Sequence, residues 1–256
     1  MYQQLHITAI IPALNEELAI SQVVQGLLAL QDISGRPIVD TVIVADNGST
    51  DATAALAKAA GAQVVFEPRR GYGSACLAAI DQITATDVVV FVDGDGSVNS
   101  QQLGYLLAHI ANGADLVIGS RSLGYIQAGA MTWAQRVGTV LVATVIGWLW
   151  SAKVSDLGPF RAIRDPALQA LAMQDTAYGW TVEMQVKALQ LDFTVVEIPV
   201  DCLVRLGKSK ISGTVRGVFG AAIGMLGMVL RLRWRQWRGS LWFDSPSTTY
   251  PLDLPR

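Results

Sequence analysis

The sequence predicts an α/β fold, with a mostly parallel sheet covered by helices. Three observations favour this class: short apolar runs recur along residues 6–118, helical patterns separate them, and polar residues follow the runs. Such alternation is typical of βαβ units, whose parallel strands are buried on both faces. A chain of 256 residues suits one large domain of this kind, or one domain with an appendage.

The first two predicted units each pair a strand with a helix. Residues 6–12 are a short apolar run, and residues 17–30 show a helical pattern. The run VDTVIVA at 39–45 predicts the second strand. The alanine-rich segment 53–60 follows as a helix that Gly61 ends.

The next units repeat this order. Residues 63–67 predict the third strand and residues 74–83 the third helix. The run DVVVFV at 87–92 predicts a fourth, buried strand. A helix at 101–110 and a fifth strand at 116–118 complete the series.

Polar residues follow the first four predicted strands. In open parallel sheets, ligands bind in the crevice beyond the carboxyl ends of the strands. The residues at those ends are Asn15-Glu16, Asp46-Asn47, Arg69-Arg70 and Asp93-Gly94-Asp95. We therefore expect these side chains to converge on one crevice.

The composition points to heavy burial or contact with lipid. Hydrophobic residues make up 51% of the chain and charged residues 16%, with a mean hydropathy of +0.37, whereas soluble domains carry about 25% charged residues. The net charge of −2 argues against general nucleic-acid binding. Cys76 and Cys202 form no CxxC pair, which favours free thiols in a reducing cytosol. The first residues show no signal peptide pattern.

Two apolar runs mark the second half of the chain. Residues 137–150 and 217–230 are almost wholly apolar, but each falls short of the roughly 20 residues that span a bilayer. The first run suits a buried core helix or a helix at a membrane interface. The second run is followed by RLRWRQWR, in which arginines alternate with Trp234 and Trp237. That pattern favours a helix on an anionic membrane surface.

The Asp93-Gly94-Asp95 step predicts a cation site. Residues i and i+2 of an extended chain point to the same side, so the two carboxylates would repel each other without a positive charge between them. A hard divalent cation such as Mg²⁺ or Mn²⁺ prefers such oxygen ligands, and Gly94 allows a ligand close to the backbone. The alternative is an Asp-Gly turn that closes the strand.

Two further loops offer ligand contacts. Asp46 can accept a hydrogen bond from a nucleobase N–H, whereas Ser49 and Asp51 suit helix caps. The run from Arg69 to Ser74 opens a helix with Gly71 and Gly73, and such a helix N-terminus attracts phosphate. A dinucleotide fingerprint is the weaker interpretation, because Cys76 occupies the third glycine position and two βα units precede the run.

Arginines and one glutamate downstream are further candidates. Arg121, Arg136 and Arg205 have apolar neighbours, which favours phosphate binding over free surface charge. Glu183 lies in a helical pattern and could orient an acceptor or act as a base. The alternative is a partly exposed carboxylate that pairs with Lys187 at i+4.

Taken together, these motifs resemble family 2 glycosyltransferases of the GT-A fold. The motifs are IPALNEE, VADNGSTDAT, RGYGSA, VFVDGDGS, LVIGSR, SDLGPFRAIR, YGWTVEMQ and RLGKSKISGT, in that order. Within the family they are most similar to dolichyl-phosphate mannose and glucose synthases and their bacterial polyprenyl-phosphate relatives. The resemblance runs from about Ile7 to Val229. It implies a nucleotide-sugar donor and inversion at the anomeric carbon.

The resemblance also implies roles for residues at the donor end. Pro12, Leu14 and Glu16 match the family's donor-binding loop, although Leu14 stands where an aromatic is common. Asp46 matches the residue that reads the base. Arg69, Gly71, Gly73 and Gly94 complete the expected nucleotide-sugar contacts. Asp93 and Asp95 match the metal-binding DxD motif, and Ser97 stands where the family often has Gln.

At the acceptor end, the resemblance implies phosphate-binding residues and interfacial helices. The phosphate-binding residues are Arg121, Arg136, Arg205, Ser209 and Lys210. The runs 137–150 and 217–230 match helices that dock these enzymes on the membrane. The chain lacks the QxxRW signature of processive synthases, which favours transfer of a single sugar.

We therefore expect an inverting, Mg²⁺- or Mn²⁺-dependent transfer of one hexose from a UDP- or GDP-sugar to a polyprenyl or dolichyl phosphate. Asp93, Asp95, Arg121 and Glu183 are the expected catalytic residues. A soluble acceptor and a non-catalytic nucleotide-sugar-binding membrane protein are the alternatives. The sugar, the base and the oligomeric state stay open.

The expected organisation has three parts. Residues 1–210 form the catalytic domain, 211–243 an amphipathic, basic membrane-associated helix, and 244–256 a disordered tail. We expect a bacterial protein that is bound at the cytoplasmic face of the membrane.

Overall fold

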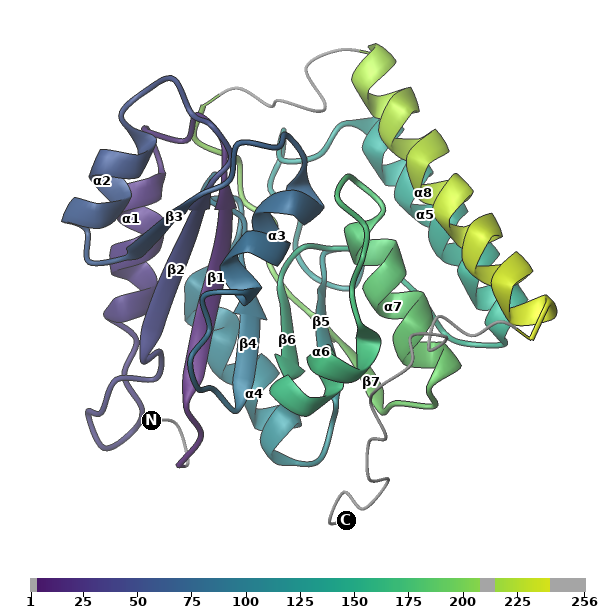
Figure 1. Cartoon of the computed structure of the whole chain (residues 1–256), viewed down its shortest axis with the longest axis horizontal. Coiled ribbons are helices and arrows are strands. Elements are labelled where there is room, and N and C mark those ends of the chain that lie inside the picture. The colour runs from purple at the N-terminus through teal and green to yellow at the C-terminus, as the bar shows by residue number, and fades with distance from the viewer. Residues whose placement is uncertain (1–3, 208–214, 240–256) are drawn as a thin grey trace.

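The computed structural model describes residues 4–207 and 215–239, with 215–223 described by their backbone alone. It contains a seven-stranded sheet with helices on both faces (Figure 1). The strands are β1 Ile7–Ala13, β2 Thr41–Asp46, β3 Gln63–Phe66, β4 Val88–Phe91, β5 Leu116–Ser120, β6 Arg161–Arg164 and β7 Val195–Pro199. The predicted fold class is confirmed.

The strand order is β3-β2-β1-β4-β6-β5-β7. β1 pairs in parallel with β2 and β4, and β3 pairs in parallel with β2. β6 is antiparallel to both of its neighbours, β4 and β5, whereas β5 and β7 are parallel. The five predicted strands are all present, and β6 and β7 were not predicted. The carboxyl ends of β1, β2 and β4 therefore lie together at one edge of the sheet.

The helices of the described residues cover both faces of the sheet and form a further group at one end of the molecule. They are α1 Ile20–Leu28, α2 Thr53–Ala59, α3 Tyr72–Ile80, α4 Leu103–Ala111, α5 Trp133–Trp150, α6 Asp165–Leu171, α7 Trp180–Gln190 and α8 Val215–Trp237. A 3-10 turn, Ser100–Gln102, precedes α4. Apolar residues of α1, α2 and α4 form a core against one sheet face. Those of α3, α6 and α7 form a second core against the other face.

Helices α5 and α8 pack side by side at one end of the molecule (Figure 1). A third apolar cluster joins them to α7 and includes Val142, Ile146, Val182, Val229 and Leu232. α5 begins four residues before the predicted run because Thr132 and Gln135 form a capping box at its N-terminus. Helix α5 buries Val142, Ala143 and Ile146 and exposes Val137, Val140 and Trp148, so one stripe of the run belongs to the core, and contact of the other stripe with a membrane stays a prediction.

The expected division into residues 1–210, 211–243 and 244–256 stays a prediction. Helix α8 covers the predicted run 217–230 and continues through the arginine- and tryptophan-rich segment. Within the described residues, no helix combines the length and the hydropathy needed to cross a membrane. The predicted tail lies outside the described residues.

Candidate functional site

A cavity of about 370 Å³ opens at the carboxyl ends of β1, β2 and β4. Each of the four predicted strand ends contributes to its lining, through Glu16, Asn47, Arg70 and the pair Asp93 and Asp95. The expected convergence of these strand ends on one crevice is confirmed. Residues of α3, α5, α7 and α8 complete the walls, so both halves of the chain build the cavity.

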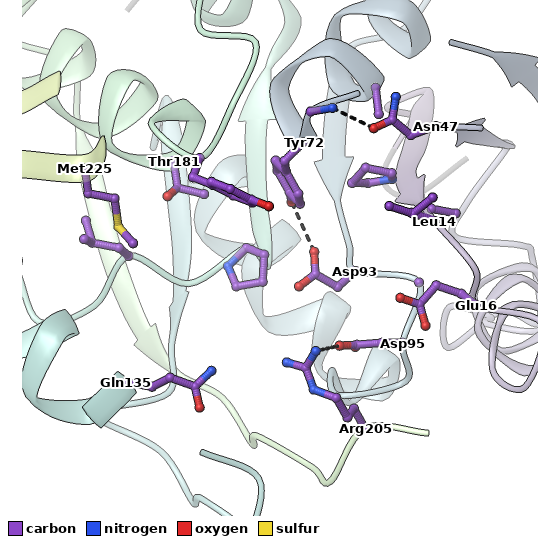
Figure 2. Close-up of a pocket in the computed structure, with 18 of the residues that line it drawn as sticks. Leu14, Glu16, Asn47, Tyr72, Asp93, Asp95, Gln135, Thr181, Arg205 and Met225 are labelled. Atoms are coloured by element: carbon purple, nitrogen blue, oxygen red, sulfur yellow. Dashed lines mark hydrogen bonds and ion pairs between the residues drawn. The ribbon is translucent and has the colours of Figure 1, made fainter. Parts of the chain in front are cut away.

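Asp93 lies in the cavity beside the hydroxyl of Tyr72 (Figure 2). The Tyr72 hydroxyl donates a hydrogen bond to Asp93 Oδ1 at 3.1 Å. Burial, and then the charge of Asp95, raise the pKa of Asp93 to about 7. Burial and the charge of Asp93 raise the pKa of Tyr72, which keeps its hydroxyl protonated. Asp93 is thus a buried carboxyl group whose ionised form Tyr72, Arg121 and Arg205 stabilise only in part.

Asp95 is buried and has a partner at each oxygen. Its Oδ1 accepts the backbone N–H of Ser97 at 3.0 Å, and its Oδ2 lies 3.1 Å from Arg205 Nη1. The bond from Ser97 is the Asp-Gly turn of the alternative interpretation, so a turn and a carboxylate pair coexist here. Ser97 does not line the cavity.

Of the residues expected to bind the donor, those at and just after the end of β1 line the cavity, whereas Asp46 at the end of β2 does not. Pro12, Leu14 and Glu16 line the cavity, but Asp46 does not. Asp46 is buried, and its Oδ1 accepts the backbone N–H of Ser49 at 3.0 Å. The next residue, Asn47, lines the cavity instead. The assignment of Asp46 to base reading is thus not supported by its position, because the carboxylate closes the turn.

The Asn47 side chain joins two loops of the cavity wall. Its Nδ2 donates to the carbonyls of Glu67 and Arg69 at 3.0 and 2.7 Å. Its Oδ1 accepts the N–H of Gly71 at 2.8 Å (Figure 2). The amide therefore fixes the loop that leads into α3.

Of the two arginines after β3, Arg70 lines the cavity and Arg69 does not. Arg69 turns back on Glu67, with Nε 3.0 Å from Oε1, and its side chain is 73% exposed. The salt bridge with Glu67 directs Arg69 away from the cavity, so the contact of Arg69 with the donor stays a prediction, and Arg70 is the arginine of this loop that lines the cavity.

The glycines before and within α3 allow the loop over 175–177 to pack closely against the helix N-terminus. A Cβ on Gly71 would lie 2.0 Å from the carbonyl oxygen of Thr176, and one on Gly73 would lie 1.9 Å from that of Asp175. The N–H groups of Gly73 and Ser74 donate to the carbonyls of the loop over 176–177. Gly71 lines the cavity, and the loop occupies two of the N–H donors at this helix N-terminus, so the expected phosphate contact there stays a prediction.

Arg121 lines the cavity and forms a bidentate pair with Asp156. Its Nε and Nη2 lie 2.8 and 2.7 Å from the two carboxylate oxygens, and its backbone N–H donates to Oδ2 at 2.7 Å. The Asp156 side chain is 1% exposed and that of Arg121 is 23% exposed. Nη1 takes no part in the pair, so a held arginine still offers donors at the cavity.

The other residues expected to bind the acceptor phosphate do not all lie at the cavity. Arg205 lines the cavity, but Arg136 is exposed on α5 and does not. α5 turns Gln135 and Gly138 toward the cavity, which leaves Arg136 on another side of the helix. Ser209 and Lys210 lie outside the described residues.

Glu183 is a structural residue of α7. It is 2% exposed and lies 2.8 Å from Lys187 Nζ, and its carboxylate accepts the backbone N–H groups of Gln174 and Asp175. The predicted i+4 pair is confirmed, although both partners are buried rather than partly exposed. Glu183 does not line the cavity. The assignment as a base is corrected, because the carboxylate shapes the loop that rests on Gly71.

Sequence reasoning missed the apolar half of the cavity. Its lining includes Met131, Thr139, Leu157, Pro159 and Met225. These residues come from α5, α8 and the segments before α5 and β6, so only the tertiary arrangement brings them together. Tyr72 and Asp156 were missed as well. The RGYGSA and SDLG motifs contain them, but their partners are distant in sequence.

Metal-binding groups are few in the described part of the chain. It holds no group of three or more His, Cys, Asp or Glu side chains that could bind a metal ion. Any cation held by Asp93 and Asp95 would therefore need ligands from a bound molecule or from water.

The chain is similar to known proteins along most of its length. Residues 8–170 match the family described as glycosyl transferase family 2. An uncharacterized glycosyltransferase of Mycobacterium tuberculosis is 38% identical over 212 residues, which cover 82% of this chain and 92% of that protein. The dolichyl-phosphate hexose transferase of Haloferax volcanii is 31% identical over 215 residues, covering 82% and 87%.

A solved structure shares the fold. Glucosyl-3-phosphoglycerate synthase from Mycobacterium tuberculosis, in complex with Mn²⁺, UDP-glucose and phosphoglyceric acid, aligns with a TM-score of 0.71. The two sequences are 22% identical, and the alignment covers 91% of this chain and 81% of that one.

Proposed function

The chain belongs to glycosyltransferase family 2, and from this we propose that it transfers one hexose from a nucleotide-sugar to a polyprenyl or dolichyl phosphate. The observation that carries the proposal is the division of the cavity. One half presents Glu16, Asp93 and Asp95, and the other is apolar and lies against α5 and α8. Arg121 and Arg205 line the same cavity, which suits an acceptor with an anionic head and an apolar tail.

Asp93 and Asp95 fit a divalent cation. They are two carboxylates on one wall, and burial and the charge of Asp95 raise the pKa of Asp93 to about 7, so a cation there would stabilise the ionised form. Mg²⁺ sites often use one or two carboxylates plus the phosphates of a substrate. When bound, Mg²⁺ or Mn²⁺ would stabilise the charge that develops on the leaving diphosphate. The metal-bound relative of the same fold supports this assignment.

The protein's own residues would then orient the two substrates. An acceptor phosphate oxygen attacks C1 of the sugar, and the bond from C1 to the diphosphate oxygen breaks on the opposite face. The electron pair leaves with the nucleoside diphosphate. Arg121, held by Asp156, would keep the acceptor phosphate in line for this attack. A phosphate is already ionised at neutral pH, so the position of Glu183 outside the cavity lining is compatible with this acceptor.

A panel of radiolabelled donors tests the proposal. UDP-glucose, GDP-mannose and related nucleotide-sugars would be incubated with a short polyprenyl phosphate and Mn²⁺. Label that passes into butanol is the expected result. A soluble acceptor is the second candidate, because the relative of the same fold is a glucosyl-3-phosphoglycerate synthase crystallised with phosphoglyceric acid. Label that stays in water and elutes with phosphoglycerate would favour it. Donor binding without turnover on any acceptor would overturn both.

Helices α5 and α8 are the proposed membrane-facing surface. Trp133, Trp148, Trp234 and Trp237 are all at least half exposed there. Arg238 lies over the Trp234 ring at 4.1 Å. Exposed tryptophans beside arginines suit the headgroup zone of an anionic bilayer. Cys76 and Cys202 are free and buried, which is compatible with the cytoplasmic side.

Removing arginines from α8 should weaken binding to anionic vesicles. Each arginine near such a surface contributes about 1 kcal/mol, so Arg231→Gln with Arg238→Gln should cost about 2 kcal/mol in vesicle flotation. The matched control, Arg36→Gln with Lys58→Gln, removes the same charge from exposed positions elsewhere. Equal flotation of both double variants would contradict the proposed surface.

A further inference from the structure

The segment 200–206, called the strap below, passes beside Asp95. The N–H of Leu203 donates to the carbonyl of Ser97 at 2.9 Å, and the N–H of Leu206 donates to that of Asp95 at 2.8 Å. On its other side, the Cys202 backbone exchanges hydrogen bonds of 2.8 and 2.9 Å with the segment 125–127. The backbone that carries Arg205 is therefore fixed next to the DxD loop.

The Arg205 side chain pairs with the Asp95 carboxylate, which the proposed cation also requires as a ligand. Its Nη1 lies 3.1 Å from Asp95 Oδ2 (Figure 2). Side-chain exposure is 31% for Arg205 and 8% for Asp95, so the pair lies at the cavity wall rather than on the outer surface. The second oxygen, Oδ1, accepts the N–H of Ser97. In this arrangement each oxygen of Asp95 has a partner without a cation.

The two positive charges compete for one carboxylate. A divalent cation on Asp95 would lie close to the guanidinium, and like charges at such separations repel strongly where water is scarce. Arg205 has a long, flexible side chain, so it can turn from Asp95 while the strap stays bonded. It lines the same cavity as Arg121. The donors that it uses on Asp95 are those that an acceptor phosphate would need.

We propose that Arg205 acts as a latch. When a divalent cation binds to Asp95, the Arg205 side chain leaves Asp95 and binds the acceptor phosphate instead. The inference rests on the proposed function, because it takes the cation and the phosphate from it. While the latch is closed, Arg205 stabilises Asp95 and is withheld from the acceptor. Cation binding releases it, so the cation prepares the acceptor site. Thermodynamic linkage makes the effect reciprocal, and an acceptor phosphate bound to Arg205 tightens the hold on the cation.

Mn²⁺ titration followed by electron paramagnetic resonance tests the latch without any turnover. The signal of free aqueous Mn²⁺ falls as the ion binds, so the metal alone serves as the probe. Arg205→Gln removes the competing charge and should bind Mn²⁺ more tightly, within the roughly 5- to 150-fold range usual for coupled sites. Arg205→Lys keeps the charge and should stay close to the wild type. Arg36→Gln, an exposed arginine paired with Asp32, is the matched control and should not change the affinity.

The outcomes separate the latch from the proposed function. Mn²⁺ binding by the wild type that Asp95→Asn removes would support the cation site. If that holds, unchanged or weaker binding by Arg205→Gln overturns the latch alone. Equal tightening by Arg205→Gln and Arg205→Lys also overturns it, because competition between charges predicts a difference. Absence of Mn²⁺ binding in the wild type and in Arg205→Gln overturns the cation site and the latch together. Thermal unfolding of each variant shows whether the fold is retained.

Discussion

Replacing Asp93 with Asn should lower the rate of sugar transfer on the order of 10³-fold, as expected when an electrostatic contact to a leaving group is lost. Asparagine keeps the shape of the side chain and an acceptor for the Tyr72 hydroxyl, so the change removes mainly charge. Asp95→Asn should have a similar effect. The measurement is the initial rate of label transfer into butanol at saturating donor and Mn²⁺.

The same substitution should leave the fold intact or make it more stable. Burial and Asp95 raise the pKa of Asp93 from 3.8 to about 7, so this group weakens the folded state progressively between those pH values and fully above about 7. Asn removes this unfavourable charge, and the melting temperature should hold or rise while transfer is lost. Asp81→Asn, at the exposed end of α3, is the matched control. Transfer that survives in Asp93→Asn and Asp95→Asn would contradict the assigned role.

Replacing Arg121 with Leu should destabilise the protein by about 3–5 kcal/mol, because it leaves a buried carboxylate without its partner. Asp156 is 0% exposed, and Arg121 holds both of its oxygens. Urea unfolding would measure the loss. Adding Asp156→Asn should recover most of it, since no uncompensated charge then remains. A double variant as unstable as Arg121→Leu alone would contradict this account.

The pH dependence of this loss has a defined sign. Burial alone would raise the pKa of Asp156, but hydrogen bonds and the charge of Arg121 outweigh it, and the pKa lies below its usual value. The pair therefore stabilises the fold fully above the usual Asp pKa of about 4, and this contribution disappears as the pH falls through the lowered value. The difference between wild type and Arg121→Leu should shrink on acidification.

The sequence predicted β1 to β5 because each lies in a short run that is rich in apolar residues. Strand β6 was missed because Arg161–Arg164 is brief and carries arginines at both ends. Arg161 is nevertheless buried, and its guanidinium donates to the carbonyls of Gly158 and Thr181. Such compensation comes from segments that are distant in sequence, so local pattern does not reveal it.

At the site, two predicted residues do not line the cavity, whereas the residue that follows each of them does. Asn47 lines the cavity rather than Asp46, and Arg70 rather than Arg69. In both loops a polar neighbour takes the predicted side chain: the Ser49 N–H binds Asp46 and Glu67 binds Arg69. Which of two adjacent polar residues turns inward depends on such loop bonds. The sequence indicates that a strand end is polar, but not which residue faces the ligand.

The exposed tryptophans on α5 and α8 should dominate changes in the intrinsic fluorescence of the protein. Of those in the described part of the chain, Trp180 lies in the core against Phe91, Trp150 is half-buried on α5, and Trp133, Trp148, Trp234 and Trp237 are exposed. Intrinsic fluorescence of the protein therefore reports mainly on one outer face. A shift to shorter wavelength would record transfer of these rings from water into a less polar medium, without a label and with little signal from the sheet.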